Sequence, residues 1–93
     1  MPYFVYILQS RTDKKLYVGC SNNLERRIND HNNGKVIATK SRKPFDLVHF
    51  EKFENKSEAF NRERYLKSLW SSRFKQKILR NYVNKIGHAD NNG

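Results

Sequence analysis

The pattern of hydrophobic and polar positions predicts three β-strands, because aromatic and β-branched residues gather in short runs between polar segments. These runs cover residues 3–8, 16–20 and 45–53. The polar residues 12–15 suit a turn, so the first two strands are expected to form a hairpin. Alternation along the second strand places Tyr17 and Gly19 on one face of the sheet, and Leu16, Val18 and Cys20 on the other.

Apolar residues at helical spacing predict three helices. The first follows the capping side chains of Ser21 and Asn22 and stops at Asn32-Asn33-Gly34. The second is capped at 55–57 and runs to about Trp70. Its apolar stripe consists of Ala59, Leu66 and Trp70, flanked by Phe60 and Leu69. The third carries the apolar residues Phe74, Ile78, Leu79, Tyr82, Val83 and Ile86.

The element order is therefore ββαβαα. It describes an α/β fold of the α+β type, in which helices flank a small, mostly antiparallel three-stranded sheet. We expect one domain over residues 1–87. Residues 88–93 show no pattern and are expected to form a loose tail.

The excess of basic residues indicates what kind of molecule the protein binds. The 19 Lys and Arg residues exceed the 9 Asp and Glu residues and give a net charge of +10, which attracts polyanions such as nucleic acid. A membrane surface is the weaker alternative, because the sequence has no long apolar run. It also shows no secretion leader, so we expect a cytoplasmic protein. The single cysteine, Cys20, excludes an internal disulfide and a cysteine-rich zinc site.

Glu63 is the most informative polar position. It lies four residues after Ala59 and three before Leu66, and therefore within the predicted apolar stripe. A carboxylate in such a place is unfavourable unless it is paired or binds a metal. Periodicity alone leaves two interpretations open: an ion pair or the edge of the stripe, and a metal ligand.

Four further side chains could take part in catalysis or in phosphate binding. The predicted hairpin brings Tyr6 and Tyr17 onto neighbouring strands, where a tyrosine acts as a general base only if its pKa falls, and otherwise packs in the core. Gly19 permits the close approach of a backbone or phosphate. Arg27 and His31 share one helical face, and an arginine there can clamp a phosphate or simply be solvated.

The remaining basic residues near the first helix are expected to contact the phosphate backbone without sequence preference, which makes binding strongly dependent on salt. They are Arg26, Lys35, Lys40, Arg42 and Lys43.

Together these positions resemble the GIY-YIG nuclease family. The resemblance rests on Phe4-Val5-Tyr6, Tyr17-Val18-Gly19, Arg27, His31 and Glu63, and covers Tyr3 to Trp70. The first motif lacks the glycine and isoleucine that give the family its name. The family's site-closing asparagine has no assigned counterpart in this sequence.

The resemblance implies a metal-dependent endonuclease acting in repair, recombination or mobile-element processing. DNA is the expected substrate, and RNA stays open. Glu63 would hold a single Mg²⁺ or Mn²⁺, and Tyr17 would activate water with Tyr6 beside it. Arg27 would stabilise the transition-state charge, assisted by His31. The chain is similar to short stand-alone bacterial members and to the amino-terminal nuclease domain of the excision-repair incision subunit, and a protein partner is a possible source of its specificity.

Two other functions compete with this one. The same fold and charge would serve a nucleic-acid-binding module without turnover. Alternatively, the final helix docks on a partner protein, an interpretation that fails if its apolar stripe covers the sheet.

Overall fold

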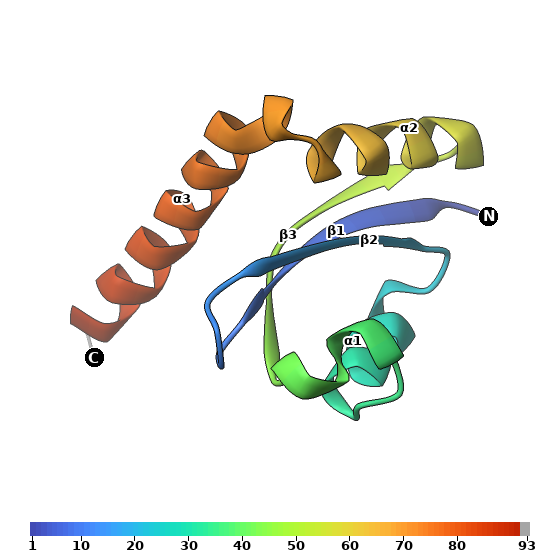
Figure 1. The fold of residues 1–93 in the computed structure, drawn as a ribbon. Coiled ribbons are helices and arrows are strands. Elements are labelled where there is room, and N and C mark those ends of the chain that lie inside the picture. The colour runs from blue at the N-terminus through green and yellow to red at the C-terminus, as the bar shows by residue number, and fades with distance from the viewer. Residues whose placement is uncertain (92–93) are drawn as a thin grey trace.

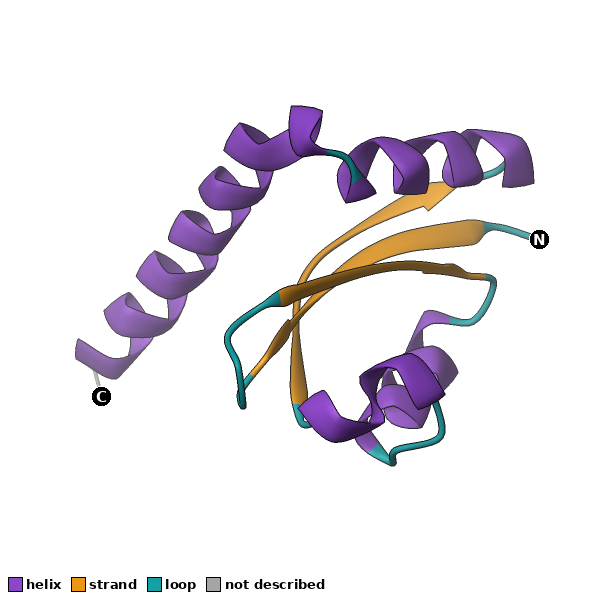
Figure 2. Ribbon diagram, in the orientation of Figure 1, coloured by secondary structure: helices purple, strands orange, loops and turns teal. Residues whose placement is uncertain are grey.

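The computed structural model describes residues 1–91, and the side chains of residues 1–86. Its elements follow the predicted ββαβαα order, with two short 3-10 helices between them (Figures 1 and 2). The strands are β1 (Tyr3–Ser10), β2 (Leu16–Ser21) and β3 (Phe45–Phe53). The helices are α1 (Leu24–Asn32), η1 (Ile37–Arg42), α2 (Lys56–Lys67), η2 (Leu69–Ser71) and α3 (Ser72–Asn91).

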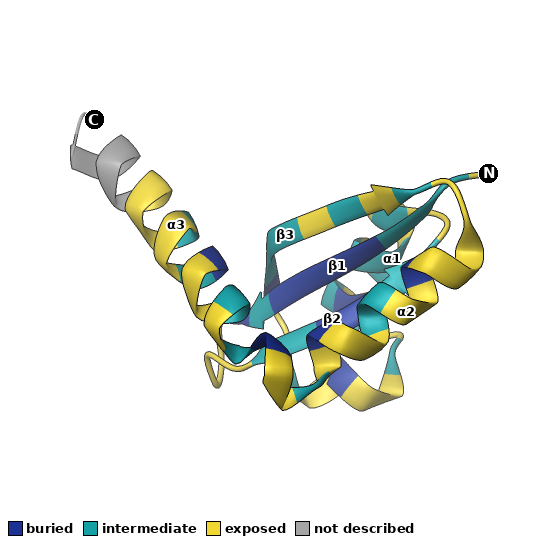
Figure 3. Cartoon of the chain, turned by 90° about the horizontal axis from the view of Figure 1, so that it is seen from above, coloured by how far each residue is buried: buried dark blue, intermediate teal, exposed yellow. Residues whose placement is uncertain are grey.

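The sheet is antiparallel throughout, in the order β2-β1-β3, which confirms the predicted fold class. The central strand β1 is buried along Val5 to Leu8 (Figure 3). It pairs with β2 through the predicted hairpin, and its pairing with β3 shifts register between Ile7 and Leu8. Strands β2 and β3 are therefore the two edges of the sheet.

Helices cover both faces of the sheet. Figure 1 shows α2 on one face and α1 on the other. The core beneath α2 contains Val5, Ile7, Val18, Ala59 and Leu66, with Leu16 and Cys20 packed against it. The core beneath α1 contains Tyr6, Leu8 and Phe45, with Tyr17 packed against it. The predicted division of β2 between the two faces is confirmed.

Asparagine side chains begin α1 and α2. Asn55 caps α2 as predicted, by accepting hydrogen bonds from the backbone N–H groups of Ser57 and Glu58. Helix α1 begins one residue later than predicted, because the cap is Asn23, whose side chain accepts from the N–H of Arg26. Gly34 follows α1 with a φ of 75°, a left-handed conformation that glycine adopts readily.

Helix α2 ends earlier than predicted. It stops at Lys67, where Ser68 adopts an extended conformation (φ −86°, ψ 163°). The stripe continues no further: Leu69 is 90% exposed and Trp70 is 88% exposed. The expectation that Trp70 belongs to the core was therefore wrong, because the chain leaves the helix before its side chain can reach the sheet.

Helix α3 covers the sheet only in part. Ile78 is buried near β3, whereas Val83 and Ile86 are 60% and 42% exposed. A groove of about 610 Å³ runs between β3 and α3. The helix continues to Asn91, past His88 where the predicted tail begins, and residues 92–93 lie outside the described part. The apolar stripe of α3 is thus partly used in the fold, which leaves the protein-docking interpretation without full support.

None of the helices in the described part of the chain is both long and apolar enough to cross a bilayer.

Candidate active site

The site begins with the pairing of Tyr6 and Gly19. These residues face one another across β1 and β2. A Cβ atom at Gly19 would collide with the ring and hydroxyl of Tyr6. The absence of a side chain at Gly19 therefore allows the phenol of Tyr6 to lie across β2, toward the edge of the sheet. The close approach that the sequence predicts at Gly19 is made by a residue of the protein itself.

A chain of buried hydrogen bonds continues from Tyr6 into α1 and η1. The Tyr6 hydroxyl lies 2.9 Å from Nε2 of His31, and Nδ1 of His31 lies 2.8 Å from Oγ1 of Thr39. We assign the His31 tautomer from this chain: Thr39 Oγ1 lies 3.4 Å from the carbonyl of Val36, and with its proton directed there its oxygen accepts the proton of His31 Nδ1. Nε2 is then unprotonated and accepts the Tyr6 hydroxyl proton.

Burial keeps both members of this pair neutral. It lowers the pKa of His31 to about 4; the positive charge of Arg27 adds to this shift, and Asp30 opposes it. Burial also raises the pKa of Tyr6 to about 12, against the effect of the Arg27 guanidinium beside its hydroxyl. At neutral pH this centre holds a phenol and an uncharged imidazole.

Tyr17 completes the aromatic cluster. Its ring lies edge-on to His31 with centroids 4.9 Å apart, and 6.5 Å from the ring of Tyr6. Unlike Tyr6, which is 1% exposed, Tyr17 is only half-buried. It is therefore the tyrosine of the pair that a water molecule or a substrate can reach.

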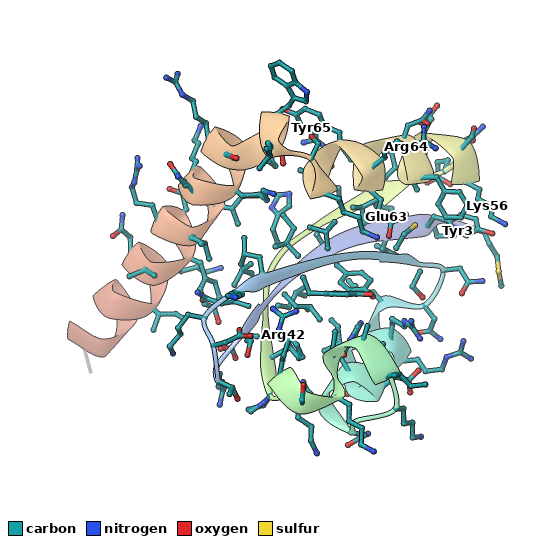
Figure 4. All side chains as sticks on the ribbon, in the orientation of Figure 1. Tyr3, Arg42, Lys56, Glu63, Arg64 and Tyr65 are labelled. Carbon is teal, nitrogen blue, oxygen red and sulfur yellow. The ribbon has the colours of Figure 1, made fainter. Side chains whose placement is uncertain are left out.

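Glu63 comes to this region from the other face of the sheet. It lies on the side of α2 that faces the sheet (Figure 4), and its side chain is 21% exposed. Burial is the main cause that raises the pKa of Tyr6 and of Cys20, and the negative charge of Glu63 adds to both shifts, so the carboxylate lies within electrostatic reach of both. Because β2 is an edge strand, groups from the two faces can meet around it.

One cation already pairs with this carboxylate. Nζ of Lys67, one helical turn away, lies 3.2 Å from Oε2 of Glu63. Beside them is a hollow of about 340 Å³, lined by Phe60, Glu63, Arg64 and Lys67. The ion pair that the sequence analysis offered as one interpretation of a carboxylate in the apolar stripe is therefore present. The hollow beside it leaves the carboxylate of Glu63 accessible.

This arrangement can be compared with known proteins. A model of the GIY-YIG catalytic domain matches residues 2–77. The chain belongs to the GIY-YIG family of nucleases. A UPF0213 protein of Clostridium perfringens is 54% identical over 67 residues, which cover 71% of each chain. A UPF0213 protein of Natronomonas pharaonis is 44% identical over 78 residues, 83% of this chain and 88% of the relative.

A solved structure supports the same assignment. The solution NMR structure of the UPF0213 protein BH0048 from Bacillus halodurans is 37% identical to this chain, with a TM-score of 0.54. The similarity covers 86% of this chain and 84% of that protein. The resemblance to short stand-alone bacterial members of the GIY-YIG family is therefore confirmed.

The GIY-YIG domain offers a divalent cation few protein ligands. Residues 1–86 contain no group of three or more His, Cys, Asp or Glu side chains placed to hold a metal. Glu63 supplies a hard carboxylate oxygen beside an accessible hollow. Mg²⁺ and Mn²⁺ accept such a ligand, and Mg²⁺ usually keeps several waters and shares substrate phosphates. The residues fit a cation held by one carboxylate, with substrate and water as the other ligands.

The predicted phosphate-binding residues divide into two groups. Four of them are exposed: Arg26, Lys35, Lys40 and Lys43. The side chains of Lys40 and Lys43 both lie near Gly34, at the end of α1. Arg42 is different, because its guanidinium binds Asp13 at 2.9 Å and lies 5.7 Å from the ring centroid of Phe45. Arg42 would therefore have to give up its contacts with Asp13 and Phe45 before it could bind phosphate.

Sequence reasoning missed Thr39. This residue is 0% exposed and is the partner of His31 Nδ1. It lies in η1, within a segment that the sequence shows only as a basic connection. Nothing in the local pattern indicates that one of its polar residues is buried.

Proposed function

We propose that this GIY-YIG protein is a metal-dependent endonuclease that hydrolyses phosphodiester bonds in DNA. The observation that carries the proposal is the convergence around one edge strand: Tyr6 and Tyr17 over Gly19, His31 and Arg27 from α1, and Glu63 from α2. A cation can stabilise charge on the phosphate, a carboxylate can hold a metal ion, and a phenol can exchange a proton with water, which are useful roles in the hydrolysis of a phosphodiester. The net charge of +10 supports a polyanionic substrate.

Tyr17 is the residue we assign to the attacking water. It is half-buried, and among the hydrogen bonds of the described residues its hydroxyl has no partner. As a general base Tyr17 first releases its hydroxyl proton to solvent, a loss that the positive charge of Arg27 and of a cation at Glu63 would favour; the phenolate then takes a proton from the water as it attacks phosphorus, which restores the phenol. General base catalysis of this kind contributes about 10²–10⁴-fold.

Tyr6 and His31 have a positioning role. A phenol with a pKa of about 12 is too weak an acid to work as a phenolate at neutral pH. Its proton is donated to His31 Nε2, so its oxygen lone pairs stay free to accept from the attacking water or from Arg27. The buried bond to Thr39 fixes the orientation of the imidazole.

Arg27 stabilises the charge that develops on the phosphate oxygens. Its guanidinium affects the pKa of both Tyr6 and His31, so it lies beside the same centre. A planar guanidinium can bond to two phosphate oxygens at once. A divalent cation bound at Glu63 would supply further charge stabilisation at the leaving oxygen.

One observation favours the non-catalytic alternative. The ion pair of Glu63 with Lys67 already neutralises the carboxylate, as it would in a module that only binds nucleic acid. The two functions differ in what a divalent cation does, because hydrolysis requires the cation to compete with Lys67 for Glu63, and binding alone does not.

The test is the incubation of supercoiled plasmid with the purified protein at low salt, with Mg²⁺, with Mn²⁺, and with an excess of chelator. We expect nicked circles with either cation and intact plasmid with chelator. Plasmid that stays supercoiled under all conditions, yet is retarded in a gel, would contradict the nuclease and support the binding module.

A further inference from the structure

Two large, strongly exposed apolar side chains stand next to each other at the bend between α2 and α3. Leu69 is 90% exposed and Trp70 is 88% exposed, although both follow directly after a helix packed on the sheet. Exposure of large apolar surface to water is unfavourable, roughly in proportion to the exposed area. A contact that covers Trp70 would recover this free energy.

Three serines hold this bend in place. Ser71 is 0% exposed, and its hydroxyl donates to the carbonyl of Leu66 at 3.0 Å. Ser68 donates to the carbonyl of Tyr65, and Ser72 donates to that of Leu69 at 2.7 Å. The indole is thus presented on a backbone fixed by hydrogen bonds, so little backbone conformational entropy remains to be lost when a ligand binds.

The charge around the bend identifies the class of ligand. Residues 64–86 contain seven basic residues and no Asp or Glu: Arg64, Lys67, Arg73, Lys75, Lys77, Arg80 and Lys85. Within the described side chains, the one ion pair that this segment makes is that of Lys67 with Glu63. The complement of such a segment is a polyanion.

A polyanion with apolar flat faces is a nucleic acid whose bases are unpaired. In a paired helix the faces of the bases are stacked on one another, whereas an unpaired base offers its face to an aromatic side chain. An acidic peptide would match the charge equally well. It has no regular flat surface for an indole, however, and the nuclease fold already supplies a nucleic-acid partner.

We propose that Leu69 and Trp70 form a stacking site for an unpaired base of the nucleic acid that the protein binds, with the basic residues of 64–86 holding the adjoining phosphates. The inference rests on the proposed function for its nucleic-acid partner and adds a preference: substrates with single-stranded or unpaired nucleotides over fully paired duplex.

The position of Trp70 suits such a role. It follows Glu63 by seven residues, so even a fully extended chain would separate the two by no more than about 25 Å. At about 3.4 Å per nucleotide in a stacked strand, this distance is at most about seven nucleotides. The indole is therefore within the length of a short oligonucleotide from the carboxylate.

The chain provides its own probe, because Trp70 is its sole tryptophan. The full-length protein is titrated at low salt with a single-stranded oligothymidylate and, separately, with a hairpin duplex of the same nucleotide count. Stacking on a base predicts quenching of the indole emission by the single strand that saturates with binding. Emission that stays unchanged while the single strand binds would overturn the proposal and leave Trp70 to a protein partner.

Variants make the test quantitative. Base–aromatic stacking of about 1–3 kcal/mol predicts that Trp70→Ala weakens single-strand binding about 5- to 150-fold, with a smaller effect on duplex, and that Trp70→Phe restores part of the affinity. Ile37→Ala is the matched control, because Ile37 is 93% exposed in η1, outside the basic segment. Equal affinity of Trp70→Ala and wild type for the single strand, or an equal loss for both forms of DNA, would overturn the stacking site.

The outcomes separate this inference from the nuclease assignment. Metal-dependent nicking with normal single-strand binding by Trp70→Ala removes the stacking site and keeps the nuclease. Loss of binding by Trp70→Ala in a protein that nicks nothing keeps the stacking site and removes the nuclease.

Discussion

Gly19 and Tyr6 occupy one space between them: the phenol of Tyr6 lies where a side chain on Gly19 would be. The relationship gives the glycine of the second motif a steric role. It also explains how the deeply buried Tyr6 reaches the edge strand that carries Tyr17, with Glu63 of α2 within electrostatic reach.

This relationship predicts that Gly19→Ala destabilises the fold, by about 1–3 kcal/mol as in other overpacked sites. The penalty should shrink in a Tyr6→Leu background, because leucine lacks the ring atoms that the new methyl group meets. Urea unfolding of the two single variants and the double variant measures the coupling, expected at about 0.5–3 kcal/mol. Strictly additive effects would show that the two residues do not share this space.

The two site tyrosines should respond differently to loss of the hydroxyl. Tyr6→Phe leaves Nε2 of His31 buried without a partner, so we expect a loss of about 1–3 kcal/mol in the free energy of unfolding. Tyr17→Phe removes a half-exposed hydroxyl and should change stability by no more than about 0.5 kcal/mol.

Although loss of the Tyr17 hydroxyl should leave stability nearly unchanged, it should strongly reduce the rate of cleavage. If the phenolate of Tyr17 takes the proton of the attacking water, Tyr17→Phe lowers the nicking rate about 10²–10⁴-fold while the protein stays folded. Circular dichroism and the nicking rate are measured on the same preparation. A folded Tyr17→Phe protein that nicks at the wild-type rate would remove Tyr17 from the role of base.

The hairpin, the third strand and the cap at Asn55 could be predicted because each depends on residues close together in sequence. The alternation that separates Tyr17 from Val18 is local in the same way. The exposure of Trp70 and the contacts of Arg42 could not be predicted, because they depend on where α2 ends and on Asp13, which is 29 residues away. The candidate residues of the site could be recognised from the sequence. Their proximity around β2 could not be predicted in the same way, because it depends on the order of the strands in the sheet.

Acid should destabilise the protein through His31. Its pKa of about 4 in the folded state lies below its unfolded value of about 6.5, so the unfolded chain binds a proton first as the pH falls. The stabilisation by the neutral imidazole is complete above pH 6.5 and is lost down to about pH 4, by up to about 3 kcal/mol.

Urea unfolding of wild type and His31→Gln at several pH values between 4 and 7 measures this contribution. The wild type should lose stability more steeply than His31→Gln over that range, whatever the stability of the variant at pH 7. His49→Gln, which alters a half-buried histidine paired with Glu51, is the control for general effects of histidine removal. Parallel pH profiles for wild type and His31→Gln would contradict a buried neutral imidazole.

The lysines at the end of α1 should bind the phosphate backbone. Replacing Lys40 and Lys43 together by glutamine is expected to weaken duplex binding about equally for all sequences. The slope of log affinity against log salt should become shallower by up to about 2, since each phosphate contact contributes about 0.9. Lys14→Gln with Lys15→Gln makes the same change in net charge on the β1–β2 turn. If this control changes the slope as much, the effect comes from net charge and not from a site at α1.

The most direct measurement of the central claim is the nicking rate of Glu63→Gln beside that of Glu58→Gln, with both proteins purified identically and DNA binding measured on the same samples. Both variants replace one carboxylate of α2, but Glu58 is exposed in its first turn, away from the hollow. We predict that Glu63→Gln lowers metal-dependent nicking by about 10²-fold or more and keeps DNA binding, whereas Glu58→Gln retains both. Equal nicking by the two variants would contradict the assignment of Glu63 and place the cleavage outside this site.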